Sequence, residues 1–359
     1  MPVYARSSER MACGRLSDLL IVNCIPEETG WGPVQHMIVL AAKLLEGEVV
    51  AAHPSKLPSA TRKTLSILHR RSKRGSGHES CLMICAGPAD LLRVLDIAGW
   101  RQRFGFLAAW IIDSFWLDHI SIATRWSRPF DHIFVTGLED VHYWNRVTQT
   151  PITWLPWGSD VLRLGCSTPE REWDVLRVGR QPPEWEDDIA TSAAAQLRGL
   201  RYRGRPSYAG KSPVQNYEFL MPIYGTSKHV LAFSNRVNPE RYTHPTREYV
   251  TARWVDALAC GATVAGIPPR GPGVDQLLWP GALLDLGTIR RDAGLDALAL
   301  ASNAWRPESA VKNNIMALRK LDWRWRLKSI ADVFGISPQP LTGELTLLKQ
   351  RIAAASSLP

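Results

Sequence analysis

Short runs of consecutive apolar residues alternate along the chain with longer segments in which apolar residues recur at helical spacing. The first run is DLLIVNCI (18–25), and a glycine-bearing loop and the helical segment VQHMIVLAAKLLEG (34–47) follow it. Because a strand that is covered on both faces reads as a continuous apolar run, each run predicts a strand of a covered sheet. The other runs lie at 81–86, 104–113, 132–137, 151–156, 173–179, 200–204, 229–235, 262–267 and 282–287.

The order of these elements predicts two domains of the α/β class. Strands that alternate with helices form a mostly parallel sheet with helices on both faces. A polar, turn-rich stretch at 158–173 interrupts the alternation, which then starts again. We therefore expect two doubly wound, Rossmann-like domains, 1–165 and 166–335, and a helical tail, 336–359. Ligands of such sheets bind at the carboxyl ends of the strands, so the cleft between the domains is the expected site.

Composition and charge narrow the class of protein. Of the 359 residues, 45% are apolar and 21% are charged, which is typical of globular proteins. Forty-three basic residues stand against 34 acidic ones. This excess favours an anionic partner, whether nucleic acid, a phospholipid surface or a phosphorylated small molecule, but it also fits a protein that is merely basic.

Cysteine usage and hydropathy predict a cytoplasmic location. The six cysteines include no C-x-x-C pair, which argues against a zinc site and a disulfide framework and suits a reducing compartment. No secretory signal is evident, and no run approaches the roughly 20 apolar residues of a membrane span. The basic segment 62–75 predicts either an amphipathic helix on anionic lipid, at the inner face of the membrane, or a solvated face.

Two loops at strand ends carry candidate ligand-binding residues. TGWGP (29–33) follows the first strand and precedes a helix, where backbone amides and the helix start favour an anion or a hydroxyl-rich group; an ordinary turn is the alternative. It is neither a G-x-G-x-x-G fingerprint nor a Walker loop, so oxidoreductase and ATPase functions lose support. Arg180 lies just beyond the first strand of the second domain and is suited to bind phosphate, or else is a surface arginine.

The segment TREYVTARWVDALACGATVAGI (246–267) predicts a helix that ends at a glycine, followed by a buried strand. Glu248 lies at or just before the helix start, where a negative charge is favourable in any case. Asp256 follows eight residues later, among apolar neighbours. A carboxylate in that setting needs either a ligand hydroxyl or a buried ion pair with Arg253 or Arg247.

This arrangement resembles the retaining GT-B glycosyltransferases that use nucleotide sugars. Their second domain carries two acidic residues separated by seven others, and the second leads into an E-A-x-A-C-G-x-P-V type run; here DALACGATV follows the same pattern. TGWGPVQHMIVLAAKLL is similar to the family's first glycine loop and helix, PITWLPWGSDV to its interdomain segment, and WDVLRVGR to the opening of its donor domain. KHVLAFSN and TREYVTARWVDALACGA also resemble the spore-coat-protein-like branch. The resemblance covers about residues 18–330.

The resemblance implies a GT-B fold whose C-terminal helices return to the N-terminal domain. It also implies transfer of a sugar, with retention, from a nucleotide-diphosphate sugar to a glycan, lipid-linked or small-molecule acceptor. Glu248 would contact hydroxyls of the donor sugar, Asp256 the ribose, and Arg180 the departing diphosphate. The remaining expected site residues are Asp113 and His119 near the reacting centre, Arg253, Tyr249, Thr251, Lys211 and Lys228 on the donor side, and Gly30, Trp31, Gly32, His36 and Trp116 on the acceptor side.

The chain departs from the family at three points. EYVTAR has no glycine beside the first acid, no lysine follows VGR within a few residues, and the second acid is aspartate. Arg253 stands at the position of the branch's arginine and is a source of the missing positive charge. No D-x-D motif is present, so we expect no metal and no cofactor beyond the nucleotide sugar.

Other functions on the same scaffold stay open at this point. One is a nucleotide-sugar epimerase or a hydrolytic relative, although no catalytic carboxylates can be assigned to it. Another is a non-catalytic protein that binds nucleotides or nucleic acid. The basic residues are dispersed, however, and the sequence contains no recognisable nucleic-acid-binding module, so nucleic acid is not an expected partner. Trp157 and Trp185 lie near loops of the expected cleft and either stack on a ligand or fill the core.

Overall fold

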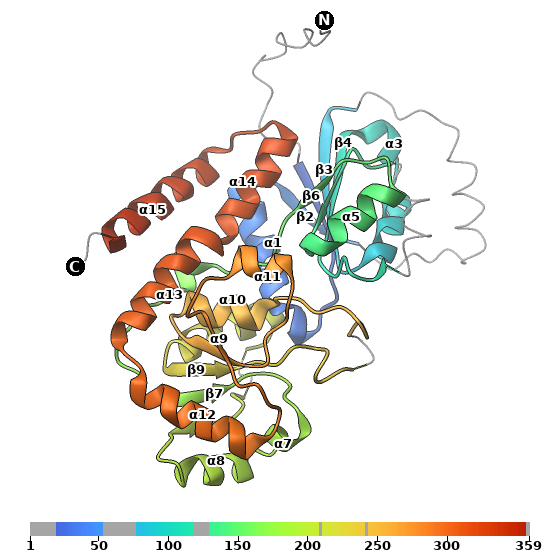
Figure 1. Cartoon of the computed structure of the whole chain (residues 1–359). Helices are drawn as coiled ribbons and strands as arrows, with labels where there is room; N and C mark the ends of the chain where they lie inside the picture. The colour runs from blue at the N-terminus through green and yellow to red at the C-terminus, as the bar shows by residue number, and fades with distance from the viewer. Residues whose placement is uncertain (1–18, 53–76, 118–128, 208–209, 241–242, 357–359) are drawn as a thin grey trace, which may run out of the picture.

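Two parallel β-sheets, each covered by helices, form the body of the protein in the computed structural model, which describes residues 19–52, 77–117, 129–207, 210–240 and 243–356. Figure 1 shows the two sheets at opposite ends of the molecule, with α1, α9 and α10 between them. Every strand pair that the structure describes is parallel, as the alternation of strands and helices predicts.

The first sheet has six strands in the order β2-β1-β3-β4-β5-β6. Its strands are β1 (Leu19–Cys24), β2 (Glu48–Ala51), β3 (Glu79–Cys85), β4 (Phe104–Ile111), β5 (His132–Val135) and β6 (Ile152–Trp154). Its helices are η1 (Thr29–Trp31), α1 (Gly32–Leu45), η2 (Pro88–Asp96), α3 (Trp100–Arg103) and α5 (Leu138–Val147). The apolar runs predict all of these strands except β2, and the expected helix after β3 is mostly a 3-10 helix, η2.

The second sheet has five strands in the order β11-β10-β9-β7-β8. Its strands are β7 (Trp173–Arg177), β8 (Tyr202–Arg203), β9 (Ser227–Leu231), β10 (Thr263–Gly266) and β11 (Leu283–Asp285). Around it lie α6 (Val161–Leu164), α7 (Pro183–Glu186), α8 (Asp188–Gln196), α9 (Pro213–Tyr224), α10 (Ala252–Ala259), α11 (Pro272–Leu277) and α12 (Arg291–Ala304).

The chain returns to the first sheet through its last helices, as the resemblance implies. These are α13 (Pro307–Lys320), α14 (Trp323–Phe334) and α15 (Gln339–Ser356). In Figure 1, α12, α13 and α14 run along one side of the molecule from the second sheet to the first. Trp323 and Leu327 of α14 are fully buried in the same core cluster as α1 and β4, and the ring of Trp323 lies 5.8 Å from that of Trp110. The boundaries expected at 165 and 335 stay predictions.

A buried network of charges joins the domains behind the cleft. The Arg324 guanidinium is fully buried and contacts Asp160 at 2.7 Å, Glu344 at 2.6 Å and Asp322 at 3.1 Å. Asp160 also receives a hydrogen bond of 3.0 Å from His36 Nε2 of α1. Because a buried charge without a partner is strongly unfavourable, these contacts fix the junction between α1, α14 and the interdomain segment.

Candidate functional site

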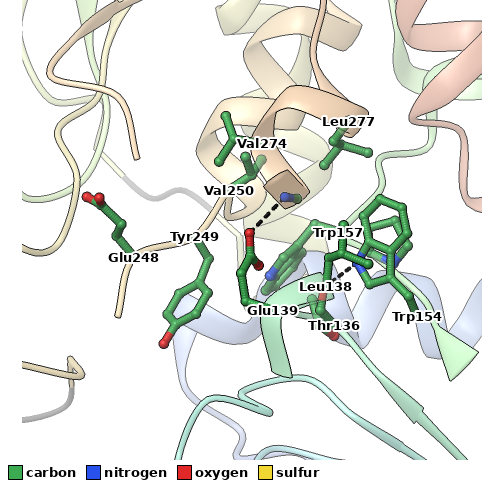
Figure 2. A pocket seen from close by; sticks show the side chains of 13 residues that line it. Thr136, Leu138, Glu139, Trp154, Trp157, Glu248, Tyr249, Val250, Val274 and Leu277 are labelled. Atoms are coloured by element: carbon green, nitrogen blue, oxygen red, sulfur yellow. Dashed lines mark hydrogen bonds between the residues drawn. The ribbon is translucent and has the colours of Figure 1, made fainter. Parts of the chain in front are cut away.

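A small pocket lies between the two sheets, where the carboxyl ends of their strands face each other (Figure 2). The first domain contributes residues that follow β5 and the end of β6 with the residues after it, and the second contributes the loop before α10 and one side of α11. Its volume of about 30 Å³ is enough for one or two water molecules. The lining residues are Thr136, Gly137, Leu138, Glu139, Trp154, Pro156, Trp157, Glu248, Tyr249, Val250, Gly273, Val274 and Leu277.

Glu248 is held in a fixed position just before α10, where the sequence predicts it. Its Oε2 accepts a hydrogen bond of 2.5 Å from Ser234 Oγ, and Arg236 lies 3.7 Å from Oε1. The Asn235 side-chain amide ties the preceding turn down by donating to the carbonyl oxygen of Arg247 at 2.6 Å. The Ser234 hydroxyl therefore orients the carboxylate, whose other oxygen faces the exposed Arg236 side chain and can accept from hydroxyl groups.

Glu139 closes the pocket from the opposite domain. Its Oε1 accepts a hydrogen bond of 2.7 Å from the backbone N–H of Gly273 in the first turn of α11 (Figure 2). Gly271, just before the helix, has φ of 142°, and a Cβ there would lie 2.7 Å from the same oxygen. Glycine is thus required for this approach. The sequence shows only an acidic residue in the first turn of a helix, and that signal does not reveal a partner in the other domain.

Aromatic rings from both domains stack beside the pocket. The ring of Phe115 stacks on that of Tyr249 with centroids 4.1 Å apart, and the centroids of the Trp116 and His244 rings are 5.5 Å apart. The expected site residues Tyr249 and Trp116 are therefore brought into one aromatic cluster across the cleft. Trp157 also lines the pocket, whereas Trp185 is fully buried in the core of the second domain.

Two carboxyl groups of the first domain have raised pKa values near this cluster. Burial raises the pKa of Asp113, which follows β4, to about 7. Burial raises the pKa of Asp140 to about 6, although Ser114 Oγ donates to it at 2.6 Å. The pKa of Tyr249 is also raised, first by burial and then by Asp140, so its phenol stays neutral. A carboxyl group with a pKa near 7 exchanges its proton readily at neutral pH, which suits Asp113 to acid–base chemistry.

Asp256 lies apart from this pocket, in a second polar cluster between the domains. Its Oδ1 accepts hydrogen bonds from Ser159 Oγ at 2.6 Å and from Tyr217 OH at 3.1 Å, and burial raises its pKa to about 7. The His36 ring contacts Tyr217 with centroids 5.0 Å apart. We call Asp256, Ser159, Tyr217 and His36 the Tyr217 cluster. The hydrogen-bond partners of Asp256 are hydroxyl groups of the protein, whereas the sequence predicts that this carboxylate binds either a ligand hydroxyl or an arginine.

The basic candidates of the second domain lie outside the described lining of the pocket. Arg180 pairs with Glu240 at 3.5 Å, and its carbonyl oxygen accepts from Arg253 Nη1 at 2.9 Å. Lys228 pairs with Asp174 at 2.7 Å. Of the other expected donor-side residues, Lys211 is exposed and hydrogen-bonded through its backbone to Gln215, and Thr251 is the N-cap residue of α10. On the acceptor side, Trp31 is the N-cap residue of α1, and Gly30 precedes it in η1.

Gly32 faces the second domain, with Pro213 and Tyr217 of α9 as its neighbours. His119 and the segment 62–75 lie outside the described residues, so their expected roles stay predictions. In the part of the chain that the structure describes, no group of three or more His, Cys, Asp or Glu residues is arranged to hold a metal ion. Among the same residues, no helix combines the length and apolar character that a membrane span needs.

Comparison with known proteins identifies the fold. No family model matches the sequence, and no curated protein matches it significantly. A glycosyltransferase from Rickettsia africae ESF-5 matches the structure with a TM-score of 0.51 at 10% identity, over 88% of this chain and 98% of that chain. The apo form of the lipopolysaccharide outer core galactosyltransferase WaaB gives 0.48 at 12% identity over 88% and 99%, and the calicheamicin glycosyltransferase CalG4 gives 0.41 at 10% over 89% and 98%. With its two doubly wound parallel-sheet domains facing across a cleft, the chain has the GT-B fold.

Proposed function

We propose that this protein is a glycosyltransferase that moves a sugar from a nucleotide-diphosphate sugar to a glycan, lipid-linked or small-molecule acceptor. The observation that carries the proposal is the Glu248 carboxylate, fixed by a hydrogen bond from Ser234 in the cleft of a GT-B fold. Parallel α/β sheets bind ligands at this edge. In this assignment the second domain holds the donor and the first domain holds the acceptor.

The chemistry needs a stabilised leaving group and a route for one proton. The bond between the anomeric carbon and the diphosphate oxygen breaks, and a bond to the acceptor oxygen forms. Arg180 and Arg253 supply guanidinium groups for the diphosphate, so the proposed reaction proceeds without a metal. Glu248 accepts from hydroxyls of the donor sugar. Asp113, with a pKa of about 7, takes the proton of the acceptor hydroxyl.

Entry of the donor requires the cleft to open. A pocket of about 30 Å³ holds water but not a nucleotide sugar. The hydrogen bond from the Gly273 N–H of the second domain to Glu139 of the first domain joins the two sides of the cleft directly. We propose that this contact breaks when the donor enters and re-forms, or is replaced, when the domains close and exclude water during transfer.

Thermal shift with a panel of nucleotide sugars tests the proposal. We expect at least one UDP-, GDP- or other nucleotide sugar to raise the melting temperature, and Arg180→Ala to abolish that rise. Arg198→Ala is the matched control, because Arg198 pairs with Asp296 on the outer face of the same domain. Glu248→Gln should keep the response to the nucleotide diphosphate and lose turnover. No response to any nucleotide would refute the proposal.

Product analysis tests the finer features. Proton NMR of the glycoside should show the anomeric configuration of the donor, and an inverted product would overturn retention. Activity should survive treatment with a chelator. If the acceptor is lipid-linked, the basic segment 62–75 should bind anionic vesicles in co-sedimentation, consistent with a protein at the cytoplasmic face of a membrane. A transferase that stays in the supernatant would refute that contact alone.

A further inference from the structure

Two thiols from different elements meet where α6 leads into the second domain. Cys166 follows α6, and Cys260 is the C-cap residue of α10. The Cys166 thiol donates to the Cys260 carbonyl oxygen at 3.7 Å, and the Cys260 thiol lies 3.9 Å from the carbonyl oxygen of Leu164 in α6. Gly225 leaves the room for this contact, because a Cβ at that position would lie only 2.2 Å from Cys166 Sγ.

The two thiols differ in their access to solvent. Cys166 is partly exposed and lines an open cavity of about 560 Å³ together with Thr168, Arg171 and Gly225. Cys260 is fully buried behind it, and its thiol donates to the Met221 carbonyl oxygen at 3.1 Å. A small molecule in the cavity can therefore reach Cys166 first, and Cys260 only through Cys166.

The charge around the pair favours the thiolate of Cys166. The neighbouring Cys260 thiol lowers the pKa of Cys166 to about 6, and the nearby Arg171 guanidinium adds to the effect. Arg171 is itself buried and anchored to the Cys260 carbonyl oxygen at 3.0 Å. The pKa of Cys260 is raised well above its usual value by the neighbouring Cys166 thiol and by burial. A partly exposed thiolate beside a cation is the setting in which cysteines react.

A second pair of neighbouring cysteines provides the contrast. Cys24 and Cys85 are directly paired in the register of β1 and β3, and both are buried in the core of the first sheet. Burial raises the pKa of Cys85 well above its usual value. Proximity is thus shared by both pairs, whereas an opening to solvent and an anchored guanidinium belong to the Cys166–Cys260 pair.

We propose that Cys166 and Cys260 form a thiol modification site that reacts with low-molecular-weight disulfides and closes to an intramolecular disulfide. The Cys166 thiolate attacks one sulfur of RSSR, forms a mixed disulfide and releases RS⁻. Cys260 then loses its proton to RS⁻ or to solvent and attacks Cys166 Sγ, which expels the second RS⁻. The two cysteines are oxidised, RSSR is reduced to two thiols, and the new bond ties the segment after α6 to the end of α10.

Peptide mapping of the full chain tests this site. The reduced protein is incubated with glutathione disulfide, quenched in acid, alkylated and digested without reduction. We expect one crosslinked species that joins Cys166 to Cys260 and is two hydrogen atoms lighter than the two free peptides. Cys260→Ser should stop at a mixed disulfide on Cys166, and Cys166→Ser should leave Cys260 free. Cys24→Ser is the matched control and should not change the crosslink.

The rate of the first step separates a reactive site from slow general oxidation. In Cys260→Ser, the rate at which the mixed disulfide forms measures the attack by Cys166 alone. In wild type, the rate of alkylation of Cys166 should rise with pH around a midpoint near 6, well below the pKa of an ordinary thiol. Cys13, which lies outside the described residues, is replaced by serine in these measurements. The proposal fails if folded wild type yields no Cys166–Cys260 peptide, or if Cys166 reacts no faster than the cysteines of the unfolded chain.

Discussion

Replacement of Asp256 by asparagine is expected to make the protein more stable at neutral and alkaline pH. The carboxyl group is 2% exposed, and burial raises its pKa from 3.8 to about 7 despite the hydrogen bonds from Ser159 and Tyr217. The unfolded chain thus ionises at this residue near pH 4, and the folded chain only near pH 7. Between these values folding requires uptake of a proton, so stability falls as the pH rises through this window and is lowest above it.

The magnitude follows from the size of the shift. About three pKa units at about 1.4 kcal/mol each give roughly 4 kcal/mol of destabilisation above pH 7 that is absent below pH 4. Asparagine keeps an oxygen for the two hydroxyl donors, but its amide N–H groups need new acceptors, which costs about 1–3 kcal/mol. We therefore expect the free energy of unfolding of Asp256→Asn to exceed that of wild type by about 1–3 kcal/mol at about pH 8 and to fall below it near pH 4.5.

Urea unfolding at a series of pH values measures this difference. Asp174→Asn is a control of opposite sign, because the Lys228 ion pair at 2.7 Å outweighs burial and holds the pKa of Asp174 below its usual value. That variant should lose stability at pH 8 and approach wild type as the pH falls below about 4. The reasoning is refuted if Asp256→Asn is destabilised equally at pH 5 and pH 8, since its carboxylate would then be ionised throughout.

The same variant also tests the functional role of Asp256. A buried carboxyl group that lowers stability is expected at functional sites. If Asp256 contacts the ribose, Asp256→Asn should melt higher than wild type without ligand and yet lose most of the rise that a nucleotide produces. If that rise is unchanged, Asp256 acts only within the Tyr217 cluster.

Further variants test the cleft, the site and the core. Glu139→Ala removes a charge-assisted hydrogen bond worth about 1.5–3 kcal/mol and should open the cleft, which small-angle scattering would detect as a larger radius of gyration. Glu184→Ala is the control: it removes a similar contact of 3.0 Å to the start of a helix within one domain and should leave the radius of gyration unchanged. Ser234→Ala should lower turnover about tenfold, the equivalent of roughly 1.4 kcal/mol, with little change in melting temperature. In urea unfolding, Leu327→Ala on buried α14 should cost about 2–5 kcal/mol, and Leu347→Ala, 47% exposed, within about 0.5.

The fold was accessible from the sequence because both sheets are buried on both faces. Strands such as β1 and β4 consist almost entirely of buried apolar residues, so their runs stand out from the polar loops. The edge strand β2 is the exception, because its EVVA sequence is short and mostly exposed. A strand of that kind has no pattern to distinguish it from a loop, and only pairing with β1 makes it part of the sheet.

The site was only partly accessible, because its residues meet through the packing of the domains. Glu248 lies where the sequence predicts it, since a polar turn followed by an amphipathic segment marks the start of α10. Glu139 meets Gly273 across 134 positions of the chain, and no local pattern encodes that distance. Phe115 and Tyr249 likewise stack across the cleft, and although Tyr249 is an expected donor-side residue, no pattern in the sequence indicates Phe115 as its partner.

The spacing of Glu248 and Asp256 does not by itself place both on one face of a helix. Helical periodicity applies only from Ala252 onward, so Asp256 is on the helix and Glu248 is in the extended segment before it. Their carboxylates consequently have separate partners, Ser234 for the first and Ser159 and Tyr217 for the second. Glu248 lies in the segment that leads into α10, Asp256 lies within that helix, and Cys260 is its C-cap residue. One helix therefore connects the segment of Glu248 to the Tyr217 cluster and to the thiol pair.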